Sequence, residues 1–156
     1  MRYLDRIAIE HPLSMDRVIS ISREFLPEAC RRRPWDYTGH GVNLLSNEVQ
    51  MDSYLTAYGE MHMMKCRAAF QNFPFENLPF NVEIVDWGCG QGIATLTFLD
   101  VLRERGLIDR IKKVTLVEPS VCTLARAEAN VRNALYGKNV IVCPINKYLP
   151  APYPSP

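Results

Sequence analysis

The stretch that decides the fold is VEIVDWGCGQGIAT, residues 82–95. An apolar run ends in Asp86, glycines follow at every second position (Gly88, Gly90 and Gly92), and a helix-forming segment comes next. Glycine adopts positive φ without strain and has no Cβ, so a ligand can lie directly on such a backbone. The following helix offers unpaired N–H groups and the positive end of its dipole. This order predicts a strand, a tight turn and a helix, with a ligand site at the carboxyl end of the strand.

Two more strands are predicted downstream of this stretch. Residues 113–118 form an apolar run that starts about 30 residues after the first strand, the spacing of a right-handed βαβ unit with parallel strands. A helix is predicted at 92–105, and a second helix leads from Ser120 to a short third strand at 140–142. Largely apolar strands are typical of parallel sheets that helices cover on both faces. The predicted fold class is α/β, a Rossmann-like parallel sheet truncated after three visible strands and preceded by accessory α-helices.

A resemblance to a known family rests on two of these strand ends. Residues 86–92 have the pattern Asp-x-Gly-x-Gly-x-Gly after a buried strand, and Glu118 closes the next strand. This arrangement resembles the first motif of class I S-adenosylmethionine-dependent methyltransferases, together with the acid that this family keeps for the ribose hydroxyls. The resemblance covers residues 80–143, about the first half of such a domain. It implies S-adenosylmethionine as the cofactor.

The resemblance also implies a role for each residue of the loop. The glycines give close approach to the cofactor, Asp86 helps to hold its amino-acid end, and Glu118 takes the ribose diol. The alternative for Glu118 is an acid that caps the following helix. Cys89 stands where a small residue is needed; the alternative, a nucleophile, lacks an evident partner base. The implied cofactor-binding residues of the loop are Asp86, Gly88, Cys89, Gly90, Gly92 and Glu118.

A dinucleotide-binding site is the main alternative interpretation of the glycines. Its fingerprint, G-x-G-x-x-G, requires glycine at position 93, where this chain has Ile93. It also places a pyrophosphate at the start of the helix, where the carboxylate of Asp86 is unfavourable. The residues therefore favour the methyltransferase-type site.

A long helix is predicted before the first strand, from a cap at Ser46 to about Phe70, packed on the sheet. Tyr54, Tyr58 and His62 are each four residues apart, so their polar tips form a ladder on one face. In the resembled family such a helix often roofs the cofactor pocket, which makes Tyr58 and His62 candidate contacts of the methionine end. The alternative is a core stripe with hydrogen-bonded tips, and no metal site is predicted. The expected apolar stripe consists of Met51, Tyr54, Leu55, Tyr58, Met61 and Ala68.

Three segments are predicted along the chain. Residues 1–80 form an accessory helical segment that packs on the sheet, with a helix capped by Ser14, and residues 81–143 form the cofactor-binding βαβαβ unit. Residues 144–156 form a proline-rich tail in which no further strand is expected. The first strand is then left as an unpaired edge, which predicts self-association or a partner chain at the exposed edge of strand 82–86.

Composition narrows the class of protein. The 156 residues suit one domain, and a net charge of +1 gives no general attraction to nucleic acid or to an anionic membrane. The five cysteines lack any C-x-x-C pair, which argues against a disulfide framework or a zinc site and predicts a cytoplasmic location. No run approaches the roughly 18 apolar residues of a membrane span. Arg31–Arg33 either contacts an anionic group or forms a solvated helix end.

The predicted function is the cofactor-binding portion of an S-adenosylmethionine-dependent methyltransferase, with a methyl acceptor of unknown class. The alternative is a non-catalytic S-adenosylmethionine-binding or interaction module that another chain completes. No catalytic residue is identified, because the wall that holds the acceptor comes, by resemblance, from segments after the third strand. The 156 residues alone are therefore not expected to transfer a methyl group.

Overall fold

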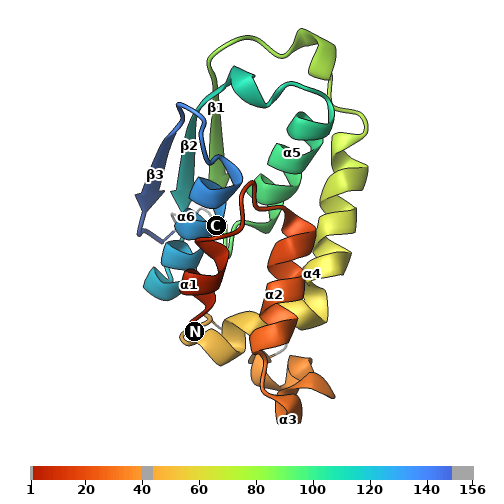
Figure 1. The fold of residues 1–156 in the computed structure, drawn as a ribbon, viewed down its shortest axis with the longest axis vertical. Helices are drawn as coiled ribbons and strands as arrows, with labels where there is room; N and C mark the ends of the chain where they lie inside the picture. Colours follow the sequence, from red (N-terminus) through yellow and green to blue (C-terminus); the bar gives the residue numbers. More distant parts are fainter. Residues whose placement is uncertain (1, 40–43, 149–156) are drawn as a thin grey trace, which may run out of the picture.

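The computed structural model describes residues 2–39 and 44–148 of the chain (Figure 1). Short helices come first, a long helix follows, and strands and helices then alternate. The elements are, in order, α1 (Tyr3–Ile7), α2 (Met15–Phe25), α3 (Glu28–Arg31), the 3-10 helix η1 (Pro34–Tyr37), α4 (Glu48–Phe70), η3 (Phe75–Asn77), β1 (Val82–Trp87), α5 (Ile93–Glu104), η4 (Ile108–Arg110), β2 (Ile111–Val117), α6 (Val121–Ala134) and β3 (Ile141–Ile145).

The three strands form one parallel sheet in the order β1-β2-β3. In its central row Ile84 pairs with Val114, which pairs with Val142, and these three side chains pack in the hydrophobic core. Helix α5 connects the first two strands and α6 connects the last two, as the βαβ spacing predicted. The α/β class with a Rossmann-like parallel sheet is therefore confirmed.

Local hydrogen bonds define the helix ends that the sequence predicted. The hydroxyl groups of Ser14 and Ser120 each accept a bond from the backbone N–H three residues later, at the starts of α2 and α6. Beyond α5, Gly106 has a φ of 69°, and the N–H of Leu107 donates to the carbonyl of Leu102 at 2.8 Å. This is a Schellman motif, in which glycine avoids the strain of the left-handed conformation.

Several predicted boundaries are wrong by one to three residues: β2 begins at Ile111 rather than at 113, and β3 ends at Ile145 rather than at 142. The cap of α4 is Asn47 rather than Ser46, because Oδ1 of Asn47 accepts the backbone N–H three residues later at 3.0 Å. Strand β3 continues through Pro144 to Ile145, although the tail was predicted to begin at 144. Proline is tolerated there because β3 lies at an edge of the described sheet, where fewer N–H groups are needed for pairing. Residues 149–156 of the predicted tail lie outside the described residues.

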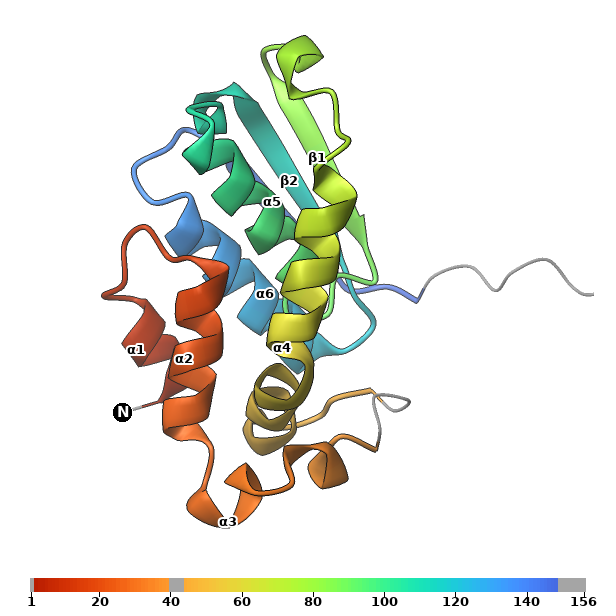
Figure 2. The ribbon, with the colours of Figure 1, turned by 90° about the vertical axis from the view of Figure 1, so that its right-hand side faces the viewer.

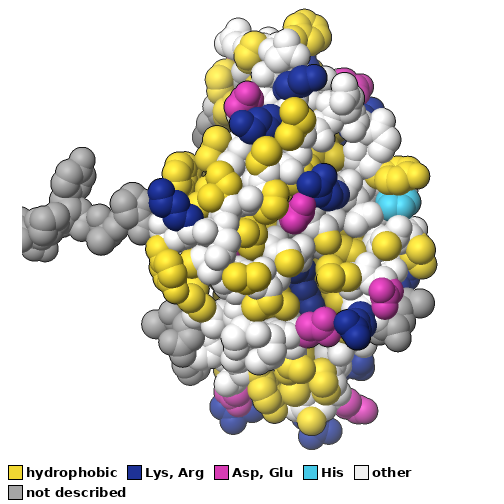
Figure 3. All heavy atoms as spheres, turned by 90° about the vertical axis from the view of Figure 1, so that its left-hand side faces the viewer, with side chains coloured by type: hydrophobic (Ala, Val, Ile, Leu, Met, Phe, Trp, Pro, Cys, Tyr) yellow, Lys and Arg dark blue, Asp and Glu magenta, His cyan; other side chains and the backbone are white. Residues whose placement is uncertain are grey.

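The helices cover only one face of the described sheet (Figure 2). Helices α5 and α6 contact the strands on this face, and α4 lies next to α5. The prediction of helices on both faces is therefore wrong for residues 2–39 and 44–148. The other side, here called the open face, shows hydrophobic side chains at the surface (Figure 3). Its most exposed apolar residues have between 43% and 58% of their surface accessible: Val85, Trp87, Ile141 and Ile145.

Helix α4 packs against α2 and α5 rather than directly on the sheet, where it was predicted. A Cβ on Gly59 would lie 3.0 Å from Cγ1 of Ile19, so the missing side chain lets α4 and α2 approach closely. The predicted stripe is partly wrong, because Met61 and Ala68 are exposed. The buried apolar positions of α4 follow every fourth residue: Met51, Leu55, Gly59 and Met63.

The accessory helices share one hydrophobic core with the sheet. Tyr3 of α1 and Leu55 of α4 belong to the same buried cluster as Val114 of β2. The carboxylate of Asp100 in α5 also accepts the backbone N–H of Met15, at the start of α2, at 2.8 Å. The predicted helical segment of residues 1–80 therefore packs tightly on the α/β unit.

Arg31 fits the second interpretation of Arg31–Arg33, a cationic helix end. Its guanidinium donates to the carbonyl groups of Leu26 at 3.0 Å and Glu24 at 3.3 Å, near the end of α2. A cation is favourable at this negative end of a helix. Arg31 thus completes the end of α2.

We expect the purified chain to self-associate with increasing concentration, because exposed apolar patches and uncovered strand edges favour association. The double variant Val85→Lys/Ile141→Glu places charges on the open face and keeps the net charge unchanged. Sedimentation velocity should show association of the wild type and a monomer for the double variant. The control Ile9→Lys changes an apolar residue that is 67% exposed outside the sheet, and it should associate like the wild type. Association of the double variant at wild-type strength would contradict this expectation.

Candidate functional site

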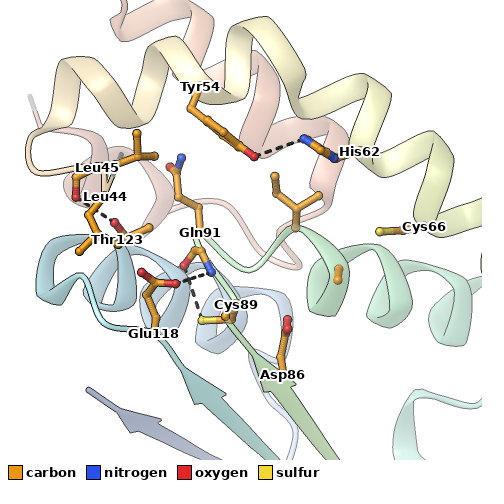
Figure 4. Close-up of a pocket in the computed structure, with 14 residues that line it drawn as sticks. Leu44, Leu45, Tyr54, His62, Cys66, Asp86, Cys89, Gln91, Glu118 and Thr123 are labelled. Atoms are coloured by element: carbon orange, nitrogen blue, oxygen red, sulfur yellow. Dashed lines mark hydrogen bonds between the residues drawn. The ribbon is translucent and has the colours of Figure 1, made fainter. Parts of the chain in front are cut away.

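A pocket lies where the carboxyl ends of β1 and β2 meet the start of α5 (Figure 4). Its volume is about 320 Å³, at the lower end of the range for small-molecule sites. Helix α4 lies on the opposite side of the pocket from the glycine turn. Two predicted site residues, Gly92 and Tyr58, are not part of its lining. The structure does bring six others together around it: Asp86, Gly88, Cys89, Gly90, Glu118 and His62.

The glycines of the turn have different surroundings. All three have positive φ, namely 68° at Gly88, 52° at Gly90 and 84° at Gly92. A Cβ on Gly90 would meet no other atom within 4 Å, whereas a Cβ on Gly92 would lie 3.6 Å from Cβ of Ala127 in α6. Gly90 therefore leaves bare backbone on the pocket wall. Gly92 instead begins α5 and lets it pack closely on α6.

Glu118 connects the end of β2 to the glycine turn. One carboxylate oxygen accepts the N–H of Gly90 at 3.1 Å and the other accepts the N–H of Ser120 at 3.0 Å. The side chain is buried, with 7% of its residue surface accessible. Glu118 also contributes to the start of α6, as the helix-cap alternative expected, because it accepts the N–H of the N-cap residue Ser120, whose hydroxyl in turn accepts the N–H of Thr123. Glu118 thus fixes the amide of Gly90 and presents its carboxylate to the pocket.

Asp86 projects from the end of β1 into the pocket. Its Oδ2 accepts the hydroxyl of Thr95 at 2.6 Å, from the first turn of α5. The side chain is half-buried and its other oxygen has no side-chain donor in the described structure. This oxygen is placed to accept a hydrogen bond from a cationic or hydroxyl-bearing ligand.

The predicted aromatic ladder of α4 is present, and part of it lines the pocket. The Tyr54 hydroxyl lies 3.2 Å from Nε2 of His62, and the two rings are nearly parallel, at 8°. Burial lowers the pKa of His62, with Lys65 as a second cause, which favours the neutral imidazole. The pocket therefore meets Tyr54 and His62, while Tyr58 packs beside them. A stripe with hydrogen-bonded tips and a roof over the pocket were alternatives for this helix. One face of α4 combines both, because Tyr54 and His62 contact each other and also line the pocket.

Cys89 has little nucleophilic character in this position. The residue is buried, and burial together with the charges of Asp86 and Glu118 raises the pKa of its thiol to about 12. A thiol with such a pKa is almost fully protonated at neutral pH, whereas the thiolate is the nucleophile. This favours the interpretation of Cys89 as a small residue that fits the turn.

Sequence reasoning missed several residues of the pocket. Leu44 and Leu45 line it from the segment before α4, and Thr123 lines it from α6, although no motif marks these positions. Tyr54 was noticed in the ladder but not assigned to the site. Gln91 was overlooked because a polar residue between two glycines resembles a solvated turn, yet it is only 2% exposed.

Comparisons with known proteins do not extend this description. No protein-family model matches the chain, and neither the curated proteins nor the solved structures gave a match. The methyltransferase resemblance therefore depends on the residues of the loop and remains a prediction.

Replacing Glu118 with alanine is expected to lower the free energy of unfolding by about 1–3 kcal/mol, because the N–H groups of Gly90 and Ser120 lose their buried acceptor. Urea denaturation followed by circular dichroism measures this loss. The control Glu118→Gln keeps the side-chain length and one carbonyl oxygen, and should lose less. An unchanged unfolding midpoint for Glu118→Ala would show that the carboxylate does not hold the turn.

Proposed function

We propose that this chain is the cofactor-binding portion of an S-adenosylmethionine-dependent methyltransferase whose methyl acceptor is of unknown class. One observation supports the proposal most strongly. The pocket wall combines the bare backbone of Gly90, at positive φ with no atom within 4 Å of its Cβ position, with the carboxylates of Asp86 and Glu118. Such a wall suits a ligand that lies directly on the main chain and carries cationic and hydroxyl groups.

The groups of S-adenosylmethionine fit the chemistry of this pocket. Its ammonium group complements Asp86, and its ribose hydroxyls can donate to Glu118, whose oxygens keep free lone pairs after each accepts one backbone N–H. The N-terminus of α5 offers unpaired N–H groups to a carboxylate. Tyr54 and His62 present aromatic rings across the pocket, and such rings attract a sulfonium cation.

The cofactor would supply a methyl group activated by its cationic sulfur, and the chain would bind and orient it. Alignment of a nucleophile with this group accounts for much of the rate in a displacement reaction. Asp86 would hold the amino-acid end of the cofactor and Glu118 its ribose, and the turn would fix its distance from the sheet. The neutral imidazole of His62 avoids repulsion of the sulfonium.

A dinucleotide is a poorer ligand for this pocket. Its pyrophosphate would approach the same turn as the carboxylates of Asp86 and Glu118, and like charges at a low-dielectric site repel each other. The close packing of Gly92 on Ala127 does serve helix packing, which is one role that glycine has in dinucleotide folds. The charge of the pocket therefore favours S-adenosylmethionine over a dinucleotide.

A second candidate function is a non-catalytic S-adenosylmethionine-binding or interaction module. The open face and the uncovered edge of β1 favour it, because both are surfaces to which another chain can bind. Transfer of a labelled methyl group to protein, RNA, DNA or metabolite extracts would distinguish the enzyme from the module.

We also propose a cytoplasmic location. All five cysteines are free thiols, as in proteins of a reducing compartment. None of the helices in the described ranges has both the length and the apolar character that crossing a membrane requires.

Isothermal titration calorimetry should show binding of S-adenosylmethionine or S-adenosylhomocysteine to the wild type and loss of binding in Gly90→Val, whose side chain would occupy the pocket wall. The matched control is Gly106→Val. Both glycines have positive φ, at 52° and 69°, and open space around the Cβ position, so valine causes similar backbone strain at either site. Only Gly90 lines the pocket, so Gly106→Val should bind like the wild type.

Two outcomes of this titration would overturn the proposal. Equal binding by Gly90→Val would place the cofactor elsewhere. Binding of NAD in preference to S-adenosylmethionine would support the dinucleotide interpretation.

A further inference from the structure

A buried polar cluster lies directly behind the glycine turn. Its side chains, here called the anchoring network, come from α1, α4, the turn and α6, and at most 3% of each residue's surface is accessible. The members are Tyr3, Asp52, Gln91, Arg126 and Asn130. None of them lies in a position that the loop motif requires, so the network needs an explanation of its own.

Gln91 is the member that belongs to the turn, and it is held at three points. Its Oε1 accepts from Nη1 of Arg126 at 3.3 Å, and its Nε2 donates to the carbonyl of Met51 in α4 at 3.0 Å. Its own backbone carbonyl accepts from Nδ2 of Asn130 at 3.2 Å. The residue between Gly90 and Gly92 is therefore fixed to both α4 and α6.

Arg126 is in turn held from two sides. Its Nη1 lies 2.5 Å from Oδ1 of Asp52, in an ion pair with almost no exposed surface. The guanidinium also lies over the ring of Tyr3, 3.8 Å from its centroid, and the Tyr3 hydroxyl donates to Asn130 at 2.9 Å. A buried ion pair is a weak source of stability, because desolvation offsets most of the attraction. Simple stabilisation of the core therefore does not account well for this arrangement.

The turn itself needs an external restraint. Glycine has more conformational freedom than any other residue, and this turn has three glycines at positive φ. A site that is ordered before the ligand arrives does not lose that entropy on binding. Glu118 holds the turn on the side of the sheet, and the anchoring network holds it on the side of the helices.

We propose that Gln91 and Arg126 are positioning residues that hold the turn in its ligand-ready conformation and so make the accessory helices part of the cofactor site. The effect on the cofactor rests on the proposed function, whereas the effect on the turn does not. A network that only filled the core would change global stability when altered. A positioning network changes the local order of the turn.

The first test is amide hydrogen exchange in the free protein with Gln91→Met, which keeps an unbranched side chain of similar length. Exchange at residues 88–92 should become roughly tenfold faster, because methionine cannot make the hydrogen bonds of the Gln91 side chain to Met51 and Arg126. The control Thr97→Val removes a part-buried hydrogen bond inside α5, from the hydroxyl of the buried Thr97 to the carbonyl of Ile93, and leaves the hydrogen bonds of residues 88–92 in place. It should leave exchange at residues 88–92 unchanged.

A second variant keeps the test valid if Gln91→Met folds poorly. Asp52→Leu/Arg126→Met replaces the ion pair with apolar side chains of similar size, and such replacements generally leave proteins as stable as before. We expect a wild-type unfolding midpoint together with faster exchange at residues 88–92. Wild-type exchange at the turn in both variants would overturn the proposal.

Binding measurements separate this inference from the proposed function. S-adenosylmethionine should bind roughly tenfold more weakly to Gln91→Met than to the wild type, with no change for Thr97→Val. Absence of binding by the wild type would refute the proposed cofactor, while faster exchange in the variants would still establish the positioning role. Unchanged affinity of Gln91→Met despite faster exchange would refute the link between the turn and the cofactor.

Discussion

The turn between β1 and α5 depends on hydrogen bonds from outside itself, and the rest of the structure is arranged to provide them. Three glycines at positive φ make the backbone accessible to a ligand, but glycine also gives a backbone more conformational freedom than any other residue. Strand β2 brings Glu118 to the N–H of Gly90 from one side. Helices α4 and α6 reach Gln91 from the other. The carboxylate of Glu118 and the side-chain amide of Gln91, which hold the turn, also line the pocket.

The accessory helices belong to this arrangement. They share the core of the sheet, α4 presents Tyr54 and His62 to the pocket, and α1 places Tyr3 over Arg126. Helix α4 could not perform these roles if it lay flat on the sheet as predicted, because α5 and α6 already occupy that face. Its position beside α5 brings one face to the pocket and another to α2. The open face of the sheet stays uncovered by the described residues.

The sequence was informative wherever a local rule determines structure. The glycine pattern, the strand-end acids Asp86 and Glu118 and the caps Ser14 and Ser120 all depend on nearby residues, and the parallel sheet follows from the spacing between its strands. Asn47 was missed because Ser46 is an equally good cap, so local preference could not choose between them.

Other features required tertiary information. Apolar residues lie on several sides of α4, so the sequence could not show that Met63 is buried and Met61 exposed. Gln91 has partners 35 to 40 positions away in the chain, and no spacing rule links them. Leu44 and Leu45 line the pocket because they lie beside it just before α4, which no sequence pattern indicates. Helices were predicted on both faces because the strands are largely apolar, yet Val85, Trp87, Ile141 and Ile145 of the strands are exposed in the described structure.

The cofactor site can be tested directly by titrating the isotopically labelled chain with S-adenosylmethionine and following the amide signals of its glycines in nuclear magnetic resonance spectra. The signals of Gly88 and Gly90 should shift in a saturable manner. The signals of Gly106 and Gly137, which also have positive φ but lie outside the pocket, should stay in place. Absence of any shift at Gly88 and Gly90 under saturating ligand, or a shift confined to other parts of the chain, would contradict the central claim that this turn is the cofactor site.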